Sequence, residues 1–147
     1  MAIRKMERED LERTAVIWLD ANLSAHGFVP ARYWEDLFEP VKGMLLQAEV
    51  YVCEEDEQIK GFIGLSGDEV AGIFVRSGGR SRGVGGRLMD FAKSRRDRLQ
   101  LHVYQKNVRA LRFYQREGFR VQCEHTDGDT GEPEYVMAWE KEDQGGR

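Results

Sequence analysis

The chain has 147 residues, 41% of them hydrophobic and 33% charged, and its 26 acidic residues against 22 lysines and arginines give a net charge of −4. The acidic balance gives no general attraction to nucleic acid or to an anionic membrane surface. The sequence holds no run of 18 apolar residues and no apolar signal segment near Met1. We therefore expect one cytoplasmic domain over residues 1–147, with a polar tail from about residue 142.

The two cysteines, Cys53 and Cys123, lie far apart and show no CxxC or Cys/His ligand spacing. The sequence therefore lacks the ligand spacing of a structural zinc site, and we predict no metal. Each cysteine stands in an apolar, strand-like run, so we expect both thiols to be buried.

The N-terminal part is predicted to form one strand and two helices. A short strand over residues 2–5 precedes apolar residues that recur at helical spacing over residues 9–22. After a loop, Pro30 suits the first position of a second helix. Pro40 should break or kink that helix, so we expect two short pieces.

Three β-rich runs separated by short polar turns follow, and they predict an antiparallel meander over residues 50–54, 59–66 and 69–75. A glycine- and arginine-rich segment then leads into a helix over residues 86–98.

The C-terminal part alternates strands with one helix. We expect strands over residues 99–103, 119–125 and 134–140, and a helix over residues 107–117 that ends at Gly118. Crossovers beside hairpins indicate an α/β protein whose mixed sheet has helices on both faces.

The most informative segment reads Arg80-Ser81-Arg82-Gly83-Val84-Gly85-Gly86-Arg87 and lies between a predicted strand and a predicted helix. Free N–H groups at a helix start, glycines that allow close approach and several arginines together describe a pyrophosphate cradle. The alternative is a surface turn with solvated arginines. A P-loop needs GxxxxGK[ST], which is absent, and a dinucleotide-binding fold needs GxGxxG after its first strand.

Two motifs make the sequence similar to the GNAT superfamily of N-acetyltransferases. Arg80-x-x-Gly83-x-Gly85 matches the family signature [Q/R]-x-x-G-x-[G/A]. Downstream, Asn107, Ala110, Phe113-Tyr114 and Gly118-Phe119 stand in the order and spacing that the family often shows. With the order of elements, the resemblance covers about residues 2–140.

The resemblance implies a twisted, mostly antiparallel sheet of about seven strands, flanked by about four helices, with a splay between strands 4 and 5 that receives acetyl-CoA. Backbone groups on strand 4 would bond the pantetheine, and N–H groups of residues 81–87 would bind the pyrophosphate. The implied cofactor-binding residues are Phe74, Val75, Arg80, Ser81, Arg82, Gly83, Val84, Gly85, Gly86, Arg87, Asn107, Ala110 and Phe113. The alternative for Asn107 is an N-cap, and both roles are compatible.

By the same resemblance, Tyr114 is the candidate acid that reprotonates the CoA thiolate, and Glu69, eleven residues before Arg80, is the candidate base. A phenol stays protonated at neutral pH, so it can donate to a thiolate. The alternatives are a packed tyrosine and a solvated hairpin glutamate. His26 and Phe28 lie in the loop that shapes the acceptor site in this family, although a lone loop histidine is more often structural.

The prediction is thus an acetyl-CoA-dependent N-acetyltransferase that modifies a primary amine of a small molecule, amino acid or peptide by direct attack in a ternary complex. A non-catalytic CoA-binding regulatory module is the alternative. A nucleic-acid binder using the arginines of residues 76–98 is disfavoured, because the whole chain is acidic. The chain could be a monomer or a homodimer.

Overall fold

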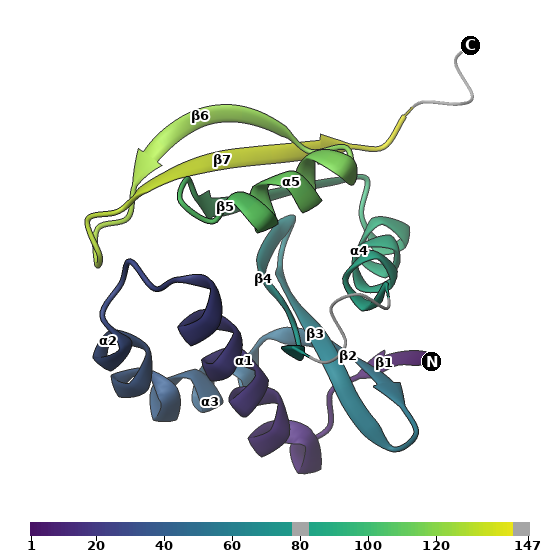
Figure 1. Ribbon diagram of the computed structural model, residues 1–147. Helices are drawn as coiled ribbons and strands as arrows, with labels where there is room; N and C mark the ends of the chain where they lie inside the picture. Colours follow the sequence, from purple (N-terminus) through teal and green to yellow (C-terminus); the bar gives the residue numbers. More distant parts are fainter. Residues whose placement is uncertain (78–82, 143–147) are drawn as a thin grey trace.

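A seven-stranded mixed sheet forms the centre of the computed structural model, which describes residues 1–77 and 83–142 (Figure 1). The strands are β1 (Ala2–Lys5), β2 (Glu49–Glu55), β3 (Gln58–Ser66), β4 (Glu69–Val75), β5 (Arg98–Tyr104), β6 (Arg120–Thr126) and β7 (Pro133–Glu140). Their spatial order is β1-β2-β3-β4-β5-β7-β6, and every neighbouring pair is antiparallel except β4 with β5.

Helices cover both faces of the sheet, which confirms the predicted fold class (Figure 1). They are the short 3-10 helix η1 (Arg8–Asp10), then α1 (Leu11–Ala25), α2 (Ala31–Asp36), α3 (Phe38–Gln47), α4 (Val84–Arg95) and α5 (Val108–Arg116). One core lies under α4 and α5, around Leu88 and Met137, and a second lies under α1 and α3, around Ala15 and Phe62.

The predicted splay lies between β4 and β5. The two strands are paired only at Glu69 and Gln100, near the start of each, and then diverge. On its other edge β4 pairs with β3, but the register jumps from Leu65–Val70 to Gly64–Gly72. Ala71 is therefore an extra residue in a β-bulge, which bends β4 beside the splay.

Several local expectations were wrong. The second helical region does form two short helices, but Pro30 is the N-cap of α2 rather than its first residue. The break falls at Leu37 rather than at Pro40, which is the third residue of α3. Proline is tolerated there because N–H groups of the first turn have no intrahelical partner. Of the cysteines, Cys53 is buried but Cys123 is exposed. Cys123 lies on β6, an edge strand whose seven residues are all exposed.

In the part of the chain that the structure describes, no helix has the length and apolar character needed to cross a membrane.

Candidate active site

A cleft of about 540 Å³ opens at the splay between β4 and β5. It is lined by residues 71–75 of β4, residues 102–104 of β5, and side chains from the end of α1, the start of α4 and one face of α5. A larger hollow of about 880 Å³ lies beyond α1, beside Arg13 and Arg76, and contains neither predicted catalytic residue. The cleft at the splay is therefore the candidate site.

The start of α4 forms one wall of the cleft. Gly83 is its N-cap with φ of +77°, a left-handed conformation that favours glycine. Val84, Gly85 and Gly86 are the first three helical residues, so their N–H groups have no partner within the helix. The side chain of Val84 is buried in the core, which leaves only its backbone for a ligand.

For the other residues of the glycine loop, the predicted contact with pyrophosphate is not supported at Arg87 and lies outside the described residues at positions 80–82. The N–H of Arg87, which the resemblance implied as a pyrophosphate donor, donates instead to the carbonyl of Gly83 at 3.1 Å. The helix has thus already used this group, and the exposed Arg87 side chain is absent from the cleft lining. Arg80, Ser81 and Arg82 lie outside the described residues.

A second wall of the cleft is β4, where Phe74 and Val75 line the cleft as expected. Beyond Glu69 no pairing to β5 occurs, so the edge of β4 that faces the cleft offers backbone N–H and C=O groups. An extended ligand with amide groups could bond this edge as an added strand.

Asn107 joins α5 to the end of α1. Its Oδ1 accepts the N–H of Ala110 at 3.2 Å, which is the N-cap bond of α5, and its Nδ2 lies 3.0 Å from His26 Nε2. His26 Nδ1 lies 2.9 Å from Asn22 Oδ1. The arrangement fits a neutral imidazole whose Nδ1 donates to Asn22 and whose Nε2 accepts from Asn107. The predicted N-cap role of Asn107 is confirmed.

Burial lowers the pKa of His26 to about 4. Because its Nε2 also accepts from Asn107, the ring is poorly suited to take a proton from an amine at neutral pH. His26 lines the cleft, but Phe28 does not. The Phe28 ring packs instead against His26 and Tyr104, with centroids 5.6 and 5.4 Å apart.

The face of α5 that points into the cleft carries Ala110, Phe113 and Tyr114, as the sequence motif predicts. Tyr114 is buried, and this burial raises its pKa above the ordinary value, so the phenol is protonated at neutral pH. Arg109 and Arg116 also line the cleft, and they were not predicted from the sequence. Their spacing to Phe113, four and three residues, is the helical signal that could have found them.

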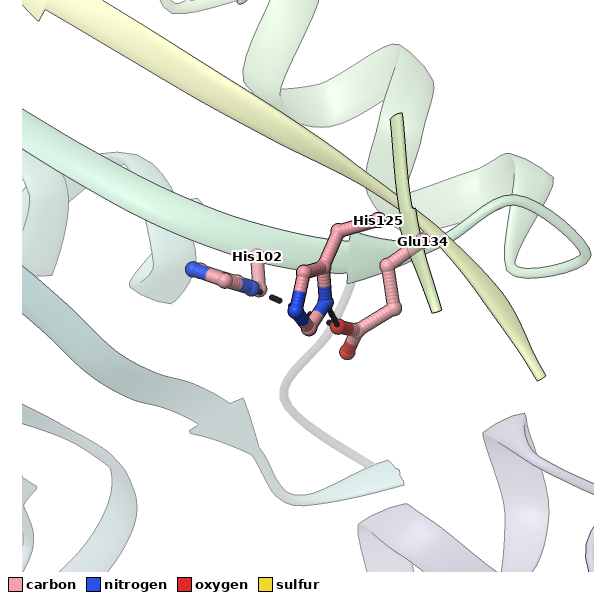
Figure 2. A group of neighbouring side chains, drawn as sticks. All are labelled: His102, His125 and Glu134. Carbon is pink, nitrogen blue, oxygen red and sulfur yellow. Dashed lines mark hydrogen bonds and ion pairs between the residues drawn. The ribbon is translucent and has the colours of Figure 1, made fainter. Parts of the chain in front are cut away.

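Glu69 lies at the start of β4, beside the cleft rather than in its lining. Its Oε2 is 3.7 Å from Nε2 of His102, and His102 does line the cleft. His102 Nδ1 is 3.3 Å from Glu134 Oε1, and His125 Nδ1 is 3.1 Å from the same oxygen (Figure 2). No local sequence pattern predicted this group, since His102, His125 and Glu134 come from three strands.

Comparisons with known proteins agree with this geometry. The profile described as "Acetyltransferase (GNAT) domain" matches residues 47–121, about half of the chain. The peptidyl-lysine N-acetyltransferase YiaC of Escherichia coli K12 is 36% identical over 140 residues, which cover 93% of this chain and 95% of YiaC. The chain belongs to the GNAT family of acetyltransferases. This confirms the predicted class, an acyltransferase enzyme with acetyl-CoA as its co-substrate.

Two solved GNAT structures extend the comparison. Apo YjaB from Escherichia coli superposes with a TM-score of 0.85 and 29% identity, over 96% of this chain and 98% of YjaB. As a curated sequence, YjaB of strain K12 is called a peptidyl-lysine N-acetyltransferase and is 31% identical over 134 residues, 90% of this chain and 91% of YjaB. The PaiA N-acetyltransferase of Thermoplasma acidophilum, solved with coenzyme A, shares the fold with a TM-score of 0.76 at 19% identity, over 95% and 98% of the two chains.

Proposed function

We propose that this GNAT protein transfers the acetyl group of acetyl-CoA to the side-chain amine of a lysine in a peptide or protein. The observation that carries the proposal is the cleft at the splay. It brings together the edge of β4 that β5 leaves unpaired, the N–H groups of α4 that have no partner within the helix, and Tyr114. The names of YiaC and YjaB, both peptidyl-lysine N-acetyltransferases, support lysine as the acceptor.

In this proposal the pantetheine arm of acetyl-CoA lies along β4 and bonds the backbone of Phe74 and Val75. The N–H groups of Val84, Gly85 and Gly86 receive the pyrophosphate, where the positive end of the helix dipole favours an anion. Arg109 and Arg116 supply cationic side chains to further phosphate oxygens. Ala110 and Phe113 form the apolar side of the channel.

The transfer is direct attack within a ternary complex. The neutral amine attacks the carbonyl carbon of the thioester, a C–N bond forms, and the C–S bond then breaks with its electron pair going to sulfur. Tyr114 donates its phenolic proton to the thiolate, and Glu69 accepts the proton that the amine nitrogen loses. A backbone N–H of β4 near the bulge at Ala71 stabilises the oxyanion.

The acceptor enters at the end of the cleft where His102 and Glu134 lie. Glu69 and Glu134 give this end a negative field, which attracts a lysine ammonium group. His26 Nε2 already accepts a hydrogen bond from Asn107, which favours Glu69 over His26 as the base. A small-molecule amine or a free amino acid is the other acceptor class that the same charges would accommodate.

The test measures acetyl transfer to a panel of amine acceptors, and the release of the CoA thiol is the signal that reports each transfer. We expect lysine-containing peptides to be acetylated at the ε-amine, and mass spectrometry of the product identifies the modified nitrogen. Faster transfer to free polyamines or amino acids than to peptides would contradict lysine as the acceptor.

Thermal melting together with the thiol assay distinguishes the enzyme from the alternative, a non-catalytic CoA-binding regulator. At acetyl-CoA concentrations of about 100 times Kd, binding alone stabilises the fold by about 2.7 kcal/mol. Stabilisation without thiol release across the whole panel would favour the regulator. The cytoplasmic location, the lack of nucleic-acid and membrane partners and the monomeric or homodimeric state stay predictions.

A further inference from the structure

Three metal-ligating side chains meet on one face of the sheet, and none of them belongs to the acetyl-CoA part of the cleft. His102 comes from β5, His125 from β6 and Glu134 from β7 (Figure 2). His125 lies directly opposite Glu134 in the β6–β7 register. His102 lies opposite Val136, two residues from Glu134 on the same face of β7. The register of three strands therefore fixes this group.

The distances within the group suit a metal ion. Glu134 Oε1 lies 3.3 Å from His102 Nδ1 and 3.1 Å from His125 Nδ1. Ligand atoms of a tetrahedral site with metal–ligand bonds of about 2.0–2.1 Å are separated by about 3.3 Å. All three donor atoms lie within 4.8 Å of one another. His125, whose side chain is 52% exposed, can turn to close the longer separation.

We propose that His102, His125 and Glu134 form a binding site for a divalent transition-metal ion of the zinc type. Two imidazoles and one carboxylate are a ligand set that such ions accept, with the remaining position left to water. With His102 bound through Nδ1, its ring proton resides on Nε2 and points to Glu69, 3.7 Å away. This distance is too long for a hydrogen bond, so Glu69 favours the proton on Nε2 through its charge.

The ligand chemistry also defines which ions should fail to bind. Mg²⁺ and Ca²⁺ require six or more oxygen ligands, and this group offers one carboxylate beside two nitrogens. Zn²⁺ and Ni²⁺ accept imidazole readily. Selectivity for Zn²⁺ over Mg²⁺ therefore separates a metal site from general attraction of cations to acidic residues.

Occupation of the site would inhibit acetyl transfer, a consequence that rests on the proposed function. His102 and Glu134 line the acceptor end of the cleft, so a bound ion would hold both side chains and repel a lysine ammonium group. The ion takes no part in the chemistry. Phe74, Val75 and the start of α4, which we propose to bind acetyl-CoA, are not ligands of the ion, so acetyl-CoA affinity should be unchanged.

The binding test uses the full chain without acetyl-CoA or amine, titrated with Zn²⁺ against a chromophoric chelator. We expect one Zn²⁺ per chain, at least tenfold weaker binding in both His125→Asn and Glu134→Gln, and no binding of Mg²⁺. X-ray absorption should show nitrogen and oxygen neighbours at about 2.0 Å and no sulfur at about 2.3 Å. No stoichiometric Zn²⁺ binding, or equal binding by wild type and both variants, overturns the proposal.

Cys123→Ser is the matched control, because this exposed cysteine lies on β6 two residues from His125 and could bind Zn²⁺ through its thiol. Binding should persist in Cys123→Ser, and its loss there overturns the proposal. His125 lies outside the cleft lining, so His125→Asn should acetylate normally without metal and resist Zn²⁺ inhibition. A protein that binds Zn²⁺ as expected but acetylates no amine would refute the proposed function while leaving the metal site intact.

Discussion

Replacing Asn107 with alanine tests the contact that joins α5 to the end of α1. The change removes the N-cap bond to Ala110, which costs about 1 kcal/mol. It also removes the only donor that reaches His26 Nε2 among the described residues, leaving a half-buried acceptor unpaired at a cost of about 1–3 kcal/mol. The free energy of unfolding should therefore fall by about 2–4 kcal/mol.

Urea denaturation of the wild type, Asn107→Ala and Asn107→Ser measures this loss of unfolding free energy, and Asn107→Ser is the matched variant. Serine keeps an N-cap oxygen but is too short to donate across to His26, so it should lose only the His26 part of the free energy. The alanine variant should lose both parts. If Asn107→Ala costs no more than about 1 kcal/mol, the bond to His26 contributes nothing and the reasoning fails.

Four further predictions follow from single residues. The pKa of His26 is about 4 in the fold against 6.5 in a free histidine, so its contribution to stability is fully present above pH 6.5 and is lost as the pH falls to 4. This contribution is on the order of 2 kcal/mol after allowance for partial exposure. Over this pH range the wild type should lose that much more stability than His26→Gln, and equal losses in the two proteins would refute the prediction. Tyr114→Phe should lower kcat about 100-fold with unchanged acetyl-CoA affinity, and a parallel loss of affinity would make Tyr114 structural. Asp10→Ala should cost about 3 kcal/mol in thermal melts, because the buried carboxylate accepts from Arg4 at 2.7 and 3.0 Å. Gly83→Ala should cost about 1 kcal/mol, whereas Gly128→Ala, in open space without a positive φ, should cost nothing measurable.

Local sequence patterns predicted the elements well because each depends on neighbours in the chain. The β4 run was predicted with both boundaries correct, since an apolar β-rich stretch between a Gly67-Asp68 turn and a glycine-rich loop has one reading. The α5 motif placed Asn107, Ala110 and Tyr114 correctly for the same reason, because helical spacing alone sets the face they share. The break at Leu37 was missed because Pro40 can occupy a first turn as well as end a helix.

The cleft's position also followed from sequence, but several roles within it did not. Whether Arg87 N–H is free depends on where α4 begins, and a boundary shifted by two residues changed the answer. Cys123 was expected inside because its strand is apolar in part, yet burial depends on which strand ends the sheet, and β6 does.

By itself, then, the sequence determined the family, the order of helices and strands, and the glycine turn that opens α4, because these depend on motifs and on spacing along the chain. Only the tertiary structure decided that His26 is a neutral partner of Asn107 and that His102, His125 and Glu134 share one site. Those contacts join residues 81 and up to 32 positions apart, and they arise from strand register and helix packing, which no local pattern encodes.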